Sequence, residues 1–218
     1  MRQVTPVPSL ARPPRLGRRL VQLVAGLVLY GISMALLIRS RLGNMPWDVL
    51  HQGLSRHLHH SIGTVTIVVG AIVLLLWIPL REKPGFGTVS NVVVIGISVD
   101  AALALIPGTD SLPVRALLAG AGIALNAVAT AAYIGAQLGP GPRDGLMTGL
   151  VRTTGRSVRL VRTGIEVVVV VLGVLLGGTV GLGTVLYALA IGPLVQMLLP
   201  RLTVGGSSRT TDPTPQRL

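Results

Sequence analysis

Four polar side chains, Asp100, Tyr30, Asn126 and Gln196, lie inside stretches that are otherwise apolar enough for lipid. An ionised carboxylate in the middle of a membrane span costs at least about 2.5 kcal/mol unless water or a partner receives it. If the four groups meet, Asp100 can bind a cation or a proton while the three neutral side chains orient a substrate. The alternative is a local hydrogen bond that locks helix packing around a protonated Asp100.

An internal repeat predicts that these side chains do meet. Residues 26–106 match the segment 96 positions later at 25 of 81 positions without a gap, where about a tenth is expected by chance from this composition. At this shift Asp100 falls on Gln196 and Tyr30 falls on Asn126. We therefore expect one cluster near the middle of the membrane, with Asp100 as its charge.

The most similar part of the repeat is a motif in which Asp follows Pro by two residues. LGNMPWDVLHQGLSR contains Pro46, Trp47 and Asp48, and LGPGPRDGLMTGLVR contains Pro142 and Asp144. Pro suits the first turn of a helix because the N–H it lacks has no intrahelical partner there, and Asp interacts favourably with the positive end of the helix dipole. Both motifs therefore predict helix starts.

Two interpretations of these helices stay open. In the first, each is a short helix at the membrane surface, and Trp47 anchors the first of them in the interface. In the second, the two helix N-termini face a ligand in the manner of the half-helices of transporters. Helix-start chemistry and interfacial anchoring explain every residue type in the motif, which favours the first interpretation. Only the duplication of the motif argues for the second.

The elements that position these residues are membrane spans. About 20 helical residues cross the hydrocarbon layer of a bilayer. Three apolar runs of about this length have no charged residue: 20–38, 62–80 and 116–138. A fourth run, 86–106, contains only Asp100, and a longer one, 163–200, contains only Glu166. The last run is too long for one helix, and its GGTVGLG segment predicts a turn over 177–183. The chain thus has six predicted spans.

Three spans in each copy of the repeat force the second copy to enter the membrane from the opposite side. We therefore predict an all-α membrane protein of about six transmembrane helices in two inverted three-helix repeats, each with a short interfacial or re-entrant helix after its first span. The repeats cover 20–107 and 113–202. A basic N-terminus over 1–19 and a tail over 203–218 have too little apolar surface to fold, which predicts disorder.

The distribution of the 19 Lys and Arg residues predicts the orientation. With the N-terminus inside, 15 of them lie in cytoplasmic segments and 4 on the other side, as the positive-inside rule requires. Both termini are then cytoplasmic. The net charge of +12 fits the anionic lipids of the inner leaflet better than nucleic acid. The first apolar run is longer than that of a cleaved signal peptide, so we expect it to stay as a helix.

Residues that could support metal or enzyme chemistry do not form a motif. The chain has no Cys, and its four His lie close together at positions 51, 57, 59 and 60. They lack the four-residue spacing of a helical pair of metal ligands, so a solvated external loop is the expectation and no metal is predicted. No nucleotide-binding, nucleophile or metalloprotease motif is present, which predicts neither enzyme nor cofactor. Glu166 lies four residues after Arg162, a spacing that predicts a structural pair.

The motif LGNMPWDVLHQGLS, followed by SIG and by a GFGT turn, resembles the YczE/YitT type of uncharacterised bacterial membrane protein. The likeness covers roughly residues 20 to 200, although the second copy of the motif has Arg143 where the first has Trp47. It implies a multi-pass inner-membrane protein whose substrate is not established.

These observations predict a small transporter or permease-like protein for an unknown small molecule or ion. The alternative is a membrane scaffold or regulator whose helices pack around a dry core and whose basic loops bind cytoplasmic partners. The two differ in whether the polar side chains converge on a hydrated cavity or are scattered and bonded internally. Association into a homo-oligomer stays open.

Overall fold

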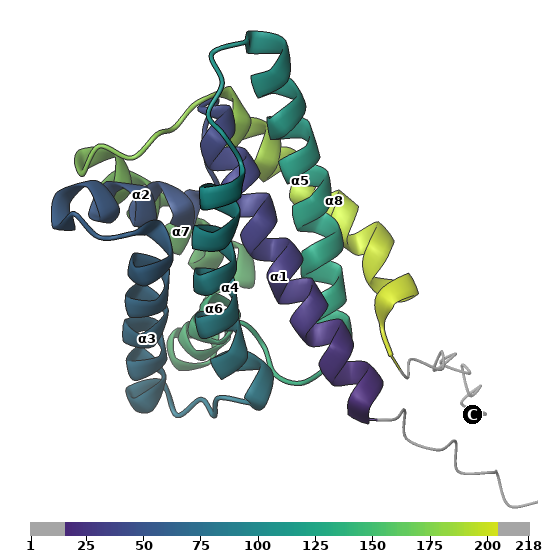
Figure 1. The fold of residues 1–218 in the computed structure, drawn as a ribbon. Helices are drawn as coiled ribbons and strands as arrows, with labels where there is room; N and C mark the ends of the chain where they lie inside the picture. The colour runs from purple at the N-terminus through teal and green to yellow at the C-terminus, as the bar shows by residue number, and fades with distance from the viewer. Residues whose placement is uncertain (1–15, 205–218) are drawn as a thin grey trace, which may run out of the picture.

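The computed structural model describes residues 16–204, and these residues form helices and connecting turns without a strand (Figure 1). In chain order the helices are α1 Leu16–Ser40, α2 Pro46–Leu58, α3 Ile62–Leu80, α4 Phe86–Leu105, α5 Leu112–Gly135, α6 Pro142–Thr154, α7 Val158–Leu175 and α8 Leu182–Leu202. The all-α fold class is therefore confirmed.

The helix starts follow from local chemistry that recurs in both halves. Pro46 and Pro142 are the first residues of α2 and α6, as the motifs predict. The side chains of Ser61 and Ser157 cap α3 and α7 by accepting hydrogen bonds from backbone N–H groups of the first turn. Every start in the second half lies 96 residues after its counterpart in the first half, so the order of a long helix, a short helix and two further helices occurs twice.

Within residues 16–204, five helices are long and apolar enough to cross a bilayer: α1, α3, α4, α5 and α8. The predicted break in the last apolar run is confirmed, because α7 ends at Leu175 and α8 begins at Leu182. Helix α7 has 18 residues but carries Arg159, Arg162 and Glu166 in its first half, so it is less apolar than the other five.

The ends of the chain differ slightly from the predicted boundaries. Helix α1 begins at Leu16, so the last four residues of the segment predicted to be disordered are helical. At the other end, Val204 is buried and its backbone N–H donates to the carbonyl of Gly135 over 3.0 Å. Residues 1–15 and 205–218 lie outside the described part of the chain.

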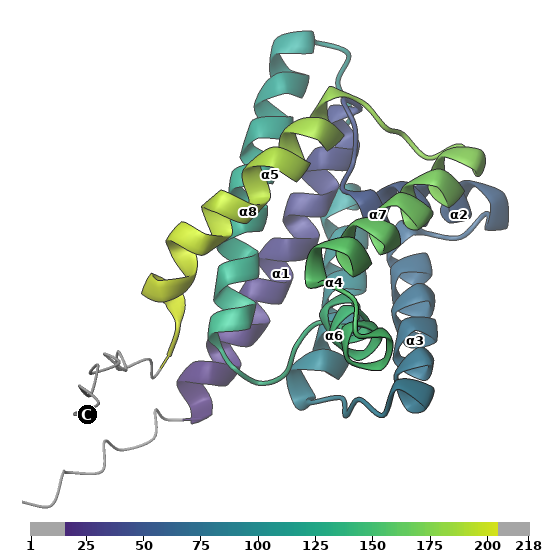
Figure 2. The same cartoon turned by 180° about the vertical axis from the view of Figure 1, so that it is seen from behind.

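Helices α1 and α5 form the centre of the molecule, with α4 packed on α1 and α8 on α5 (Figure 1). The apolar core lies mainly among α1, α4 and α5, and includes Leu27, Met34, Val99 and Ile123. The remaining helices pack across the two halves, since α2 lies against α7 and α3 against α6. One difference between the halves stands out in Figure 2: α3 runs along α4, whereas α7 and α8 diverge.

The contact between α1 and α5 depends on two corresponding glycines. A Cβ added to Gly26 would lie 2.8 Å from the backbone nitrogen of Tyr133, and one added to Gly122 would lie 2.9 Å from Cγ of Leu37. Gly26 and Gly122 are 96 residues apart, and so are Leu37 and Tyr133. The same close contact is thus made twice, as small residues allow between membrane helices.

We predict that Gly26→Val destabilises the protein by about 2 kcal/mol or more, because the obstructing atoms belong to a backbone that cannot rotate away. The measurement is thermal unfolding of the purified protein in detergent. Gly120→Val is the matched control, since a Cβ at Gly120 meets nothing within 4 Å. Equal unfolding temperatures for the two variants would contradict this account of the α1–α5 contact.

Candidate functional site

The two short helices are held in place by a pair of matching loops. Gly43 and Gly139, which precede α2 and α6, have φ angles of 124° and 127°, in the left-handed region that favours glycine. The carbonyl of Leu42 accepts a hydrogen bond of 2.8 Å from the N–H of Gly183, and the carbonyl of Leu138 accepts one of 2.8 Å from Gly87. Each loop is therefore bonded to the start of a helix in the opposite half.

This arrangement brings the starts of α2 and α6 together. Trp47 and Arg143 are the second residues of the two helices and are 96 positions apart. The guanidinium carbon of Arg143 lies 4.8 Å from the centre of the Trp47 ring, which is a cation–π contact. Corresponding positions of the two halves thus touch each other directly.

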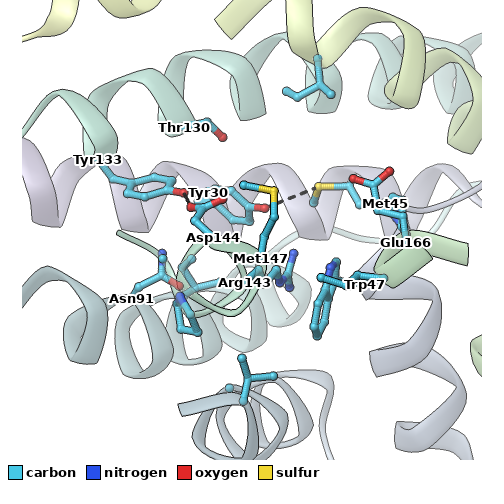
Figure 3. Close-up of a pocket in the computed structure, with 18 of the residues that line it drawn as sticks. Tyr30, Met45, Trp47, Asn91, Thr130, Tyr133, Arg143, Asp144, Met147 and Glu166 are labelled. Carbon is cyan, nitrogen blue, oxygen red and sulfur yellow. Dashed lines mark hydrogen bonds between the residues drawn. The ribbon is translucent and has the colours of Figure 1, made fainter. Parts of the chain in front are cut away.

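A cavity of about 320 Å³ lies beside this contact, and all eight helices contribute to its lining. That volume is within the range of small-molecule sites. Figure 3 shows Asp144 beside Tyr133 and Tyr30, with Arg143 between this group and Trp47. The polar lining side chains, apart from Trp47, are Tyr30, His51, Thr66, Asn91, Thr130, Tyr133, Arg143, Asp144, Arg162, Glu166, Tyr187 and Gln196.

Four of the lining residues carry permanent charge, and two of them pair with each other. Arg162 Nε donates to Glu166 Oε1 over 3.0 Å, which is the pairing predicted from their spacing, and both side chains reach the cavity. Asp144 Oδ2 accepts a hydrogen bond of 3.1 Å from the hydroxyl of Tyr133. Arg143 lies 3.8 Å from Asp48 Oδ1, beyond the usual length of a hydrogen bond.

Asp48 differs from its counterpart Asp144 because it is completely buried. Neither of its carboxylate oxygens accepts a hydrogen bond from a described residue, although His51 Nδ1 is 3.3 Å from Oδ1. Burial lowers the pKa of His51, which disfavours a charged imidazole beside Asp48. Arg143 is therefore the permanent positive charge beside Asp48.

A second group of hydrogen bonds connects α1, α5 and α8 behind the cavity. Asn126 is fully buried, donates to Ser33 Oγ over 2.8 Å and accepts from the hydroxyl of Tyr187 over 2.9 Å. Tyr187 lines the cavity, and Tyr30 packs edge-on against Tyr133 with ring centres 6.2 Å apart. The hydrogen bond to Asn126 thus orients Tyr187, and the ring contact orients Tyr30 against Tyr133.

The four residues predicted to cluster do not all meet. Tyr30 and Gln196 line the cavity, and Asn126 is bonded to one of its lining residues. Asp100 is not in the lining: its carboxylate accepts hydrogen bonds from Ser61 Oγ over 2.6 Å and from the N–H of Gly63 over 2.8 Å. It lies in the last two turns of α4, opposite the start of α3, because the two helices are antiparallel neighbours. The position that we took for the middle of the span is close to its end.

From their motifs, Trp47 and Asp144 were predicted as parts of helix starts, with Trp47 also as an interfacial anchor, whereas Arg143, Tyr133 and Tyr187 were not predicted as site residues. The available signal was the correspondence of position 47 with position 143, since equivalent positions can meet where two repeats join. His57, His59 and His60 are exposed at the far end of α2 and beyond it. No group of three metal-ligating side chains occurs between residues 16 and 204.

Comparisons with known proteins agree with the membrane assignment. The profile of a family of unknown function, DUF6198, matches residues 17–200. An uncharacterized protein of Haemophilus influenzae is 39% identical over 177 residues, which is 81% of each chain. The uncharacterized membrane protein YczE of Bacillus subtilis is 31% identical over 179 residues, covering 81% of this chain and 83% of YczE. The resemblance to the YczE type is thereby confirmed. No solved structure gave a significant match.

We predict that Arg143→Met destabilises the protein by about 2 kcal/mol, because it leaves the buried carboxylate of Asp48 without its positive neighbour. Adding Asp48→Asn should restore part of that loss, since the uncompensated charge is then removed. Thermal unfolding of the two single variants and the double variant measures this coupling. Arg41→Met serves as the control, because Arg41 pairs with Asp110 at the exposed surface and should matter little. Strictly additive effects of Arg143→Met and Asp48→Asn would rule out the pair.

Proposed function

The chain belongs to the family of unknown function DUF6198, and we propose that it is a small transporter of the bacterial inner membrane that handles its substrate in the central cavity. It is a multi-pass membrane protein with five strongly apolar helices. The observation that carries the proposal is the convergence on one cavity of charged, hydroxyl and amide side chains from seven helices, together with the indole and imidazole of α2. A scaffold whose helices pack around a dry core is not expected to contain such a polar cavity.

We further propose that the two halves are inverted relative to the membrane. Under this arrangement α1, α3 and α4 cross the membrane outward, inward and outward, whereas α5, α7 and α8 cross it inward, outward and inward. The short helices α2 and α6 then enter from opposite faces. The recurrence of the helix order after 96 residues and the reciprocal bonds at Leu42 and Leu138 support it. So does the excess of Lys and Arg in the segments assigned to the cytoplasm, with both termini on that side.

The short helices have a defined role in this proposal. Pro46 and Pro142 have no N–H, and the N–H groups of Asp48 and Asp144 donate to the carbonyls of Met45 and Gly141. The N–H groups of Trp47 and Arg143 are therefore left at the positive ends of the two helix dipoles, and both residues line the cavity. Neither α2 nor α6 has a side-chain cap. A polar substrate would therefore meet both helix starts at once, near the contact between Trp47 and Arg143.

Transport requires that the cavity open to each side of the membrane in turn. The pairing of α2 with α7 and of α3 with α6 makes two units that each contain helices of both halves. The divergence of α7 from α8 leaves one edge of the assembly less tightly packed than the corresponding edge between α3 and α4. We propose that movement of the α2–α7 unit against α8 alternates the access, while α1 and α5 remain fixed.

We predict that Asp144→Asn abolishes transport while leaving the protein abundant in the membrane. The amide oxygen still accepts the hydrogen bond from Tyr133, but the charge offered to a substrate is lost, which lowers uptake about tenfold or more. The measurement is uptake into proteoliposomes from a panel of radiolabelled amino acids, short carboxylates and quaternary amines. Asp100→Asn is the matched control, because Asp100 caps α3 outside the cavity, and its uptake should stay within about twofold of the unaltered protein.

Two results would count against the proposal. One is a panel in which no solute enters the proteoliposomes faster than it enters empty vesicles. The other is uptake that survives Asp144→Asn but is lost in Asp100→Asn, which would move the site to the start of α3.

A further inference from the structure

A second hollow lies next to the central cavity, between α3, α6 and α7. It has a volume of about 530 Å³. Apart from Thr154, Arg156 and the indole of Trp47, its lining consists of aliphatic residues and a glycine: Val73, Leu76, Leu146, Leu150, Leu160, Val161, Gly164, Ile165, Val168 and Val169. We call this hollow the apolar cleft. Hydrogen bonds to a polar ligand are therefore available only from Thr154, Arg156 and the indole of Trp47.

The apolar cleft and the central cavity share part of their walls. Trp47, Val73 and Ile165 line both, so these three side chains form the partition between them. Arg143 lies over the face of Trp47 and lines the central cavity but not the cleft. A polar compartment and an apolar compartment thus adjoin across one indole ring.

The apolar cleft lies where an alkyl chain can enter it from the lipid bilayer. Helix α7, which forms one of its walls, has large exposed apolar side chains along its length, among them Val167, Val171 and Leu175. In a membrane protein such a face lies against acyl chains. An alkyl chain can therefore enter the cleft beside α7 without crossing water.

The charges of the central cavity indicate which kind of headgroup is attached to the alkyl chain. Arg162 and Glu166 pair with each other, whereas Arg143 donates no hydrogen bond to any described residue and Asp144 accepts one bond, from Tyr133. Arg143 and Asp144, adjacent in sequence, are thus the two charged lining residues that do not pair with another charged lining residue, although Arg143 also lies 3.8 Å from the buried carboxylate of Asp48. Such a pair is complementary to a group that carries both charges.

We propose that the substrate is a single-chain zwitterionic amphiphile, whose headgroup lies in the central cavity and whose alkyl chain lies in the apolar cleft. The inference rests on the proposed function, because the headgroup occupies the transport cavity. It adds the substrate class and a route of entry from the membrane. Trp47 marks the boundary, with its ring between the charged headgroup and the chain.

The test uses a lysophosphatidylcholine with a twelve-carbon chain that carries a photoreactive diazirine near its end, added to the protein in lipid nanodiscs. After illumination, mass spectrometry locates the labelled residues. In the unaltered protein the label should fall on residues of the cleft, such as Leu150 and Val168. Unlabelled lysophosphatidylcholine should displace the probe at lower concentration than dodecyl phosphate or dodecyltrimethylammonium, each of which carries charge of one sign only.

Two glycine variants make the test specific. A Cβ at Gly164 or at Gly120 meets nothing within 4 Å, so Gly164→Leu and Gly120→Leu should both fold, with leucine the better helix former. Gly164 lines the cleft and Gly120 does not. Gly164→Leu fills the cleft and should reduce its labelling at least about tenfold, while Gly120→Leu should leave the labelling unchanged.

The inference is overturned if the cleft is labelled equally in Gly164→Leu, if Val171 and Leu175 are labelled as often as the cleft, or if a two-chain phosphatidylcholine probe labels the cleft as well as the single-chain probe does. Its failure can be distinguished from failure of the proposed function. Gly164→Leu should still take up any small solute that the panel identifies, whereas Asp144→Asn should take up none.

Discussion

The positions of the two short helices depend on hydrogen bonds accepted by two backbone carbonyl groups. The chain leaves its helical path before α2 and before α6, and backbone groups withdrawn from water at such breaks need partners inside the protein. The carbonyls of Leu42 and Leu138 find them in the N–H groups of Gly183 and Gly87, each in the other half. Neither half can therefore provide a hydrogen-bond partner for the carbonyl at its own break. The requirement ties the start of each short helix to the opposite half, and it brings the two starts together beside the central cavity.

The meeting of the two halves is symmetrical in its backbone and asymmetrical in its chemistry. Where equivalent positions touch, one half provides Trp47 and the other Arg143. Asp48 is sealed behind this contact without a hydrogen bond, while Asp144 faces the cavity with one bond from Tyr133. A duplicated motif has thus supplied an aromatic surface, a cation and two carboxylates in different environments. The divergence of α7 from α8 extends the same asymmetry to the outer helices.

Periodic and local features were predictable from the sequence, whereas the composition of the site was not. Pro46 and Pro142 marked the starts of α2 and α6, and the GGTVGLG segment marked the break before α8, because these signals act within a few residues. Asp100 was misplaced because an apolar run does not reveal how deep a residue lies once the neighbouring helix is in position. Tyr133 and Tyr187 carry no local signal at all. They belong to the site only because α5 and α8 pack beside the two short helices.

The most direct test of the account is the side of the membrane on which the two equivalent turns lie. The chain has no cysteine, so single cysteines can be placed at His60, in the turn between α2 and α3, and at Arg156, in the corresponding turn between α6 and α7. A membrane-impermeant maleimide added to intact cells should label the cysteine at position 60, and should label the one at position 156 only after the membrane is permeabilised. Labelling of both positions from the same side would contradict the inversion of the two halves and, with it, the transport mechanism.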